Sequence, residues 1–265
     1  MKLSKEEEVK YRKKEGIERI GNYDGVVFGM GNSLFEEVSD VLAPRKYLDQ
    51  LSLIERGMRY SLFDGRRNGK RILYATTTAG SSSASFRFER YFAHGPTDRS
   101  IGTGYIGATQ DDLEVGDFII PEEAIIGEGT TPYYFSQDSR VPPVLKRGYT
   151  AKPSPQILDK LIKEAMEEKI EFHSGRIYTT DSFVMETPQL IDKLNKKGVL
   201  GIDMETSCLF SIADYHSKNT AAILVVTDNQ LTHHTHTLDN FLRGREIASK
   251  KLQKAIEIST KALLR

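Results

Sequence analysis

The sequence predicts a three-layer α/β fold, and three observations lead to this prediction. Short apolar runs alternate along the chain with longer segments of helical periodicity, which is the pattern of strands and helices that follow one another in an α/β domain. No repeat of about 20–50 residues and no low-complexity tract interrupts the alternation. The length of 265 residues suits one large α/β domain, so we assign residues 1–265 to a single domain.

The first predicted elements are a charged helix, a strand and an amphipathic helix. Residues 1–20 are dense in lysine and glutamate, which predicts a solvated helix. Tyr23–Phe28 is a short apolar run that predicts a strand, and it ends at the glycines of Gly29–Gly31. Leu34–Leu42 has helical periodicity, and Pro44 just beyond it predicts the end of that helix.

A hairpin and a second helix are predicted next. Met58–Phe63 and Arg71–Thr77 indicate paired strands. Asp64–Gly69 lies between them and is rich in turn residues, so we expect it to form the connecting turn. The small residues of Ala79–Ser83 precede a segment that predicts a helix through Ala93.

The middle of the chain is less regular. Asp117–Ile120 and Ala124–Ile126 are two short apolar runs with charged residues between them. Pro142–Pro155 contains several prolines and predicts a long surface loop. Gln156–Lys169 has strong helical periodicity and predicts a helix.

The last third again alternates between strands and helices. Gly175–Thr180 predicts a strand and Pro188–Lys196 predicts a helix. Met204–Tyr215 predicts another helix, and Ala221–Thr227 predicts another strand. The final segment, Leu238–Leu264, predicts a long amphipathic helix.

Charge and cysteine content exclude several classes of protein. The 37 lysines and arginines balance 37 aspartates and glutamates, whereas nucleic-acid binders and polybasic membrane anchors carry a basic excess. The single Cys208 cannot form a disulfide within the chain. The N-terminus lacks the apolar core of a secretory signal, and no apolar run approaches the ~20 residues that span a bilayer. We therefore expect a cytoplasmic protein with no nucleic-acid or membrane partner.

Two acidic positions carry the chemistry that the residues themselves suggest. Met204 and Glu205 lie where an apolar strand becomes a helix, and a carboxylate there can accept two hydrogen bonds from a ribose diol. A glutamate at a helix start is also a favourable partner of the helix dipole, so both interpretations stay open. Asp228 ends the apolar run that begins at Val225, and α/β folds place ligands at the carboxyl ends of such strands.

The segment Gly201–Ser207 resembles the Glu-Met-Glu signature of the nucleoside phosphorylase family, with Asp203 in place of the first glutamate. That family comprises bacterial-type purine nucleoside phosphorylases, uridine phosphorylases and methylthioadenosine nucleosidases. The resemblance covers roughly residues 25–258 and implies an α/β/α fold with a central mixed, twisted sheet. Further segments that match in order are Gly102-Thr103, Gly107–Gln110, Val115–Asp117, Glu128–Thr131 and Thr180–Phe183.

The resemblance implies roles for residues that would bind the nucleoside. Met204 and Glu205 would hold the ribose. Phe183 would stack on the base, with Thr180 in the same segment. Asp228 would protonate the base at N7, as in the family members that act on purines.

The base is expected to be a purine. Uridine phosphorylases read uracil with a glutamine and an arginine shortly after the stacking phenylalanine. Thr187 and Gln189 stand at the matching positions here, so that pair is absent.

The resemblance also implies a phosphate site. Gly31, Arg56 and Thr103 match residues that hold phosphate, and Arg56 would act across a subunit interface. Leu34 stands where another arginine is expected, and Arg99 is a candidate helper that lies one or two positions from the expected place of a third.

One more arginine is expected to close over the site and assist Asp228. Arg243 and Arg245 are the two candidates, and the sequence leaves the choice open. The histidine-rich stretch His233–His236 is too tightly spaced for a helical metal site and predicts a loop, so no metal is expected.

Phosphorolysis of purine nucleosides is the predicted function, with phosphate as co-substrate and no cofactor. Hydrolysis by a nucleosidase is one alternative, although Gly31–Ser33 holds no acid where nucleosidases activate water. A uridine phosphorylase and a relative that binds nucleosides without turnover are the others. The resemblance also implies a homo-oligomer, either a dimer or a hexamer.

Overall fold

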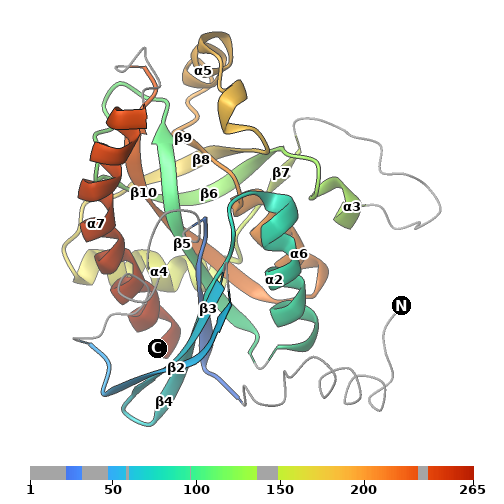
Figure 1. Cartoon of the computed structure of the whole chain (residues 1–265), viewed down its shortest axis with the longest axis vertical. Helices are drawn as coiled ribbons and strands as arrows, with labels where there is room; N and C mark the ends of the chain where they lie inside the picture. The colour runs from blue at the N-terminus through green and yellow to red at the C-terminus, as the bar shows by residue number, and fades with distance from the viewer. Residues whose placement is uncertain (1–21, 32–46, 58–59, 96, 136–148, 232–237) are drawn as a thin grey trace.

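The computed structural model describes residues 22–31, 47–57, 60–95, 97–135, 149–231 and 238–265, shown in colour in Figure 1. The predicted helices over residues 1–20 and Leu34–Leu42 lie outside these residues, as does His233–His236. Among the described residues, even the longest helix is too polar to serve as a membrane span.

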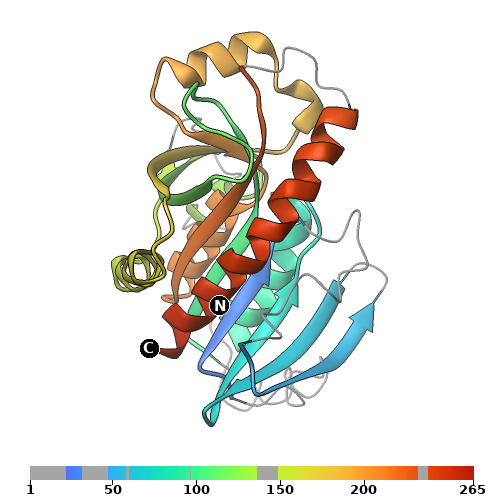
Figure 2. The ribbon, with the colours of Figure 1, turned by 90° about the vertical axis from the view of Figure 1, so that its left-hand side faces the viewer.

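A mixed sheet forms the centre of the protein. Five strands, β5, β10, β6, β8 and β9, pair in a closed ring, and β1, β4, β3 and β2 extend the sheet outward from β5 (Figures 1 and 2). Pairing is parallel for β1–β4, β1–β5, β5–β10, β6–β8 and β8–β9 and antiparallel for the rest. The strands are β1 (Gly25–Gly29), β2 (Gln50–Gly57), β3 (Tyr60–Arg67), β4 (Lys70–Thr76), β5 (Arg99–Ala108), β6 (Phe118–Gly127), β7 (Thr150–Ala151), β8 (His173–Thr180), β9 (Gly201–Asp203) and β10 (Asn219–Asn229).

Helices cover both faces of this sheet. Figures 1 and 2 show α7 and α4 on one face and α2 and α6 on the other. The helical segments are α2 (Ser81–His94), α3 (Pro132–Phe135), α4 (Pro155–Glu167), the 3-10 turn η3 (Phe183–Met185), α5 (Pro188–Asn195), α6 (Thr206–Tyr215) and α7 (Leu238–Leu264). The predicted three-layer α/β/α architecture is confirmed.

Alternating residues of the central strands build two separate cores. In β10, Ala222, Leu224 and Val226 pack toward α2 and α6, whereas Ile223 and Val225 pack toward α4 and α7. Side chains of a strand point alternately to its two faces, so a strand covered on both sides must be apolar throughout. This requirement explains why the continuous apolar runs predicted strands correctly.

The hairpin of β3 and β4 has a tighter turn than the sequence predicts. The strands continue to Arg67 and from Lys70, and only Asn68 and Gly69 make the reversal. Both turn residues have positive φ, 49° and 77°, which is the two-residue geometry that Asn-Gly favours. The predicted six-residue turn Asp64–Gly69 is therefore wrong in length.

Two strand predictions also need correction. β6 is one strand, although Asp117–Ile120 and Ala124–Ile126 were expected as separate runs, and a register shift between Pro121 and Glu123 accommodates the polar residues between them. The sequence pattern does not predict β2, β5 or β7, and β7 lies within Pro142–Pro155, which is expected to be a loop. In β5 the repeated glycines weaken the strand pattern, yet this strand lies at the centre of the sheet.

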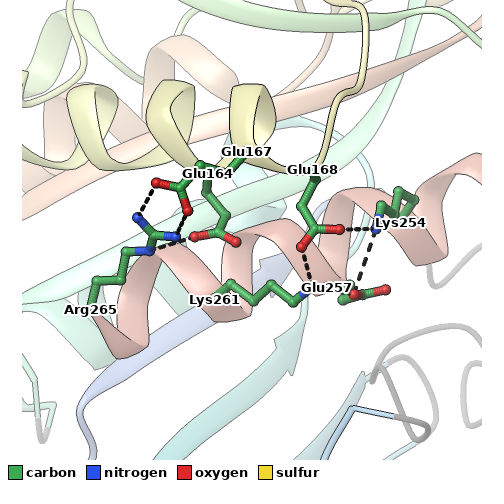
Figure 3. Close-up of polar contacts among 7 residues, drawn as sticks. All are labelled: Glu164, Glu167, Glu168, Lys254, Glu257, Lys261 and Arg265. Carbon is green, nitrogen blue, oxygen red and sulfur yellow. Dashed lines mark hydrogen bonds and ion pairs between the residues drawn. The ribbon is translucent and has the colours of Figure 1, made fainter.

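A network of ion pairs joins the end of α4 to the end of α7 (Figure 3). Glu168, just beyond α4, bonds Lys254 Nζ at 2.6 Å and Lys261 Nζ at 2.5 Å. Arg265 bonds Glu164 at 2.6 Å and also pairs with Glu167. The last residue of the chain is thereby held against the protein.

Glu168→Gln is expected to destabilise the protein by about 1 kcal/mol at low salt, because two charge-assisted bonds become neutral ones. The bonds from Lys254 and then Lys261 lower the pKa of Glu168 to about 2. Since that pKa is lowered from 4.5, the stabilisation is present above pH 4.5 and is lost as the pH falls toward 2.

Thermal unfolding at pH 7 and pH 3 measures this effect. Asp192→Asn is the matched control, because Asp192 of α5 makes an exposed ion pair with Lys196 just beyond that helix, and its loss should change Tm less. An equal change of Tm in both variants at pH 7 would contradict the prediction that the ion pairs of Glu168 stabilise the protein more than an exposed pair does.

Candidate active site

Asp203 fixes the chain where β9 leads into α6. Its Oδ2 accepts hydrogen bonds from the backbone N–H groups of Glu205 at 3.1 Å and Thr206 at 2.7 Å. Its Oδ1 accepts a bond from Thr179 Oγ1 of β8 at 2.7 Å. The carboxylate therefore caps the helix, which begins at Thr206 instead of the predicted Met204.

Glu205 is buried at this junction, with 6% of its surface exposed. Its Oε1 accepts a 2.6 Å bond from the backbone N–H of Gly80. Burial, followed by the neighbouring Asp203 charge, raises the pKa of Glu205 to about 8. A ligand that donates hydrogen bonds would stabilise a carboxyl group buried in this way.

Met204 faces the same turn. Its carbonyl oxygen accepts a 2.8 Å hydrogen bond from Ser81 Oγ. Its Cε atom lies 4.0 Å from the position that a Cβ atom at Gly80 would occupy. The start of α2 and the start of α6 thus meet at Met204 and Glu205, as Figure 1 shows for the two helices.

Gly31 follows the carboxyl end of β1, and Thr103 lies in the middle of the neighbouring strand β5, opposite Gly29. Met30 N donates to Thr103 O at 2.7 Å, which links the two segments. Gly31 has a φ of +65°, and a Cβ on it would lie 3.6 Å from Glu205 Oε1. Thr103 is fully buried, and its hydroxyl donates to Phe28 O at 3.1 Å. The structure therefore places Gly31 beside Glu205, and Thr103 beside Met30, the residue before Gly31.

Asp228 lies at the end of β10, directly after a β-bulge. Val226 pairs with Ile106 and Asp228 pairs with Gly107, so Thr227 is the extra residue. Thr227 Oγ1 donates to Asp228 Oδ1 at 2.8 Å, and Gln230 Nε2 donates to Asp228 Oδ2 at 2.7 Å. Both oxygens of the carboxyl group are held by neighbours.

The predicted base-binding residues follow β8. Thr180 ends that strand, and its Oγ1 accepts a 3.2 Å bond from Ser182 N. Phe183 begins η3 and is 43% exposed. Glu186, one residue after η3, is buried and accepts a 3.1 Å bond from Gln230 Nε2. Burial, then the charges of Asp228 and Asp203, raises the pKa of Glu186 to about 8.

Gln230 therefore connects the base segment to Asp228, and sequence reasoning identified neither Gln230 nor Glu186. The signal in the sequence is weak, because a glutamine two residues after a strand-end acid is usual in a turn. Glu186 and Asp228 share Gln230 as a hydrogen-bond donor only because η3 lies beside the end of β10.

The two arginines predicted to bind phosphate lie in β2 and β5. Arg56 is in β2, the outermost strand of the described order and four strands from Thr103, and its side chain lies outside the described residues. Arg99 begins β5, four residues or about 13 Å before Thr103 along the strand. Arg99 is therefore at the amino-terminal end of that strand, away from Thr103.

Of the two candidate arginines in α7, the structure describes the side chain of one, Arg245. Arg245 is buried, with its guanidinium 5.1 Å from the centre of the Tyr105 ring. The side chain of Arg243 is outside the described residues, so the choice between them stays a prediction.

Known proteins resemble this chain over most of its length. A guanosine phosphorylase of Halorubrum lacusprofundi is 26% identical over 81% of this chain and 85% of its own. A DeoD-type purine nucleoside phosphorylase of Brevibacillus brevis is 32% identical over 64% of this chain and 68% of its own. A crystal structure of uridine phosphorylase from Vibrio fischeri superposes with a TM-score of 0.73 at 25% identity, covering 91% of this chain and 90% of that chain. Residues 24–261 match the phosphorylase superfamily, and the chain belongs to that family.

Proposed function

We propose that the protein catalyses phosphorolysis of purine nucleosides to the free base and ribose 1-phosphate. The observation that carries this proposal is that Gly31, in the loop after β1, lies beside Glu205, while Thr103 is linked to the same loop through Met30. A group that binds ribose hydroxyls and a loop that can approach an anion are adjacent there. The names of the purine nucleoside and guanosine phosphorylase relatives support the same reaction.

In this reaction a phosphate oxygen forms a bond to C1′ of the ribose as the bond from C1′ to N9 of the base breaks. The electron pair of the broken bond moves into the purine ring. Asp228 donates its proton to N7, so the base leaves as a neutral molecule. Glu205 accepts hydrogen bonds from the ribose hydroxyls and Met204 packs against the sugar, which orients C1′ toward the phosphate.

The remaining assignments are parts of the same proposal. Phe183 stacks on the base beside Thr180, and Gly31 and Thr103 bind phosphate. Arg56 would reach the phosphate of a partner subunit in a homo-oligomer, and Arg99 stays the weaker candidate because of its place at the start of β5. Arg243 or Arg245 assists Asp228. The enzyme would work in the cytoplasm with no cofactor.

The experiment is an assay of base release with and without phosphate. Inosine, adenosine, guanosine and uridine are incubated with the protein, and the free base and ribose 1-phosphate are separated by chromatography. We expect release of purine base that requires phosphate and yields ribose 1-phosphate in equal amount.

Each other outcome identifies one of the alternatives. Equal release without phosphate would show a nucleosidase, and preferential release of uracil would show a uridine phosphorylase. Binding of purine nucleosides without release under either condition would show a non-catalytic relative.

A further inference from the structure

Gln230 and its neighbours form a buried polar group beside Asp228. The Nε2 atom of Gln230 lies between two carboxyl groups, 2.7 Å from Asp228 Oδ2 and 3.1 Å from Glu186 Oε2. Gly107 of β5 leaves the space for this amide, because a Cβ there would lie 2.8 Å from Nε2. Any larger residue at position 107 would displace Gln230.

The amide oxygen of Gln230 has a different environment from the amide nitrogen. Gln230 is 5% exposed, and within the described residues its Oε1 is buried with no hydrogen-bond donor. A buried acceptor without a donor is unfavourable, so this atom is suited to a ligand that donates.

The two carboxyl groups determine the orientation of the amide. Both hydrogens of Nε2 are directed to Asp228 and Glu186. In this orientation each carboxyl group accepts one hydrogen bond from Nε2, through Asp228 Oδ2 and Glu186 Oε2, and Oε1 is the amide atom left for another partner. Gln230 therefore presents only an acceptor to any third partner.

We propose that Gln230 is a specificity-determining residue, and that its Oε1 accepts a hydrogen bond from the 6-amino group of the purine while Asp228 donates to N7. This assignment rests on the proposed function. N7 and the 6-substituent lie on one edge of the purine, as Asp228 Oδ2 and the Gln230 amide lie side by side in the site.

The chemistry at position 6 gives the preference. Adenine carries an amino group, which is a donor, whereas hypoxanthine and guanine carry an oxygen, which is an acceptor. An oxygen there would face Gln230 Oε1, acceptor against acceptor, and would leave the buried atom without a donor. The protein should therefore favour adenosine over inosine and guanosine.

The test compares kcat/KM for adenosine, inosine, guanosine and purine riboside, which has only hydrogen at position 6. In the wild-type protein we expect adenosine to exceed each of the others by about 10- to 100-fold. In Gln230→Met, kcat/KM for adenosine should fall until it is within about 3-fold of kcat/KM for inosine.

Gln110→Met is the matched control. Gln110 is also a partly buried glutamine, but its Nε2 donates to the backbone carbonyls of Asn195 and Val199. This variant should keep the wild-type ratio. If Gln230→Met does not fold, calorimetric binding of adenine and hypoxanthine to the wild-type protein gives the answer, with adenine expected to bind more tightly.

The failures of the two proposals are distinct. Wild-type preference for inosine or guanosine, tighter binding of hypoxanthine, or an unchanged ratio in Gln230→Met would overturn the role of Gln230 and leave phosphorolysis intact. Absence of phosphate-dependent base release from every nucleoside would instead overturn the proposed function.

Discussion

Asp228→Asn is expected to lower kcat for purine nucleoside phosphorolysis by about 10²–10⁴-fold, which is the usual contribution of a general acid. Asparagine has nearly the same shape and can still contact Thr227 Oγ1 and Gln230 Nε2, which bond the carboxyl group in the wild-type protein. It has no proton to give to N7, so the leaving base must depart as an anion. Nucleoside binding should change little, because the ribose contacts lie at Glu205.

Steady-state kinetics with adenosine and inosine, together with calorimetric binding of the nucleoside, measures both effects. Asp214→Asn on the exposed side of α6 is the matched control and should keep wild-type kcat. A kcat within about 3-fold of wild type in Asp228→Asn would exclude Asp228 as the proton donor.

Glu205→Gln is expected to lower kcat/KM by about 10- to 100-fold, because an amino group replaces one of the two oxygens that would bond the ribose hydroxyls, and a buried polar group left without a partner costs about 1–3 kcal/mol. The glutamine oxygen can still accept from Gly80 N, but its amino group then faces the ribose as a donor. A 2′-deoxynucleoside already lacks one of the two hydroxyls. The ratio of activity on ribo- and deoxyribonucleosides should therefore fall in this variant.

The same substitution is expected to stabilise the free protein at high pH. The pKa of Glu205 is raised from 4.5 to about 8, so the stability contributed by the neutral carboxyl is complete below pH 4.5 and is lost as the pH rises through 8. Glutamine stays neutral, and the Tm of Glu205→Gln should exceed that of wild type at pH 9. Glu171→Gln, at an exposed position, should show neither the kinetic nor the thermal effect. A lower Tm for Glu205→Gln at pH 9 would mean that the buried charge has a partner other than those described.

The sequence predicts the layers of the fold because a strand that helices cover on both sides is apolar throughout, and such an apolar run is recognisable without knowledge of the tertiary structure. β10 and its apolar run are the clearest case. β5 was missed because its glycines are chosen for close packing against neighbouring elements, and local propensity then points away from a strand.

The sequence indicates candidate residues where one short segment carries the chemistry, as at Met204-Glu205 and Asp228, and their roles stay predictions. No such indication exists where two distant segments share a partner. Glu186 and Gln230 are 44 residues apart, and their contact depends on how η3 lies against β10. Arg99 is a further case, because a linear motif suggests that it lies near the phosphate, whereas the structure places it at the amino-terminal end of β5, and its role stays a prediction.

The bulge at Thr227 separates two requirements that a single strand must meet. Residues up to Val226 are set by packing in the two cores, and residues from Asp228 onward are set by the site. Because Thr227 is left out of the pairing, Asp228 stands opposite Gly107, whereas regular pairing of every residue after Val226 would put it opposite Ala108. Insertions and deletions of one residue at this point therefore threaten activity more than folding, and sequences related to this chain should vary freely in the apolar residues of β10 but not in its length.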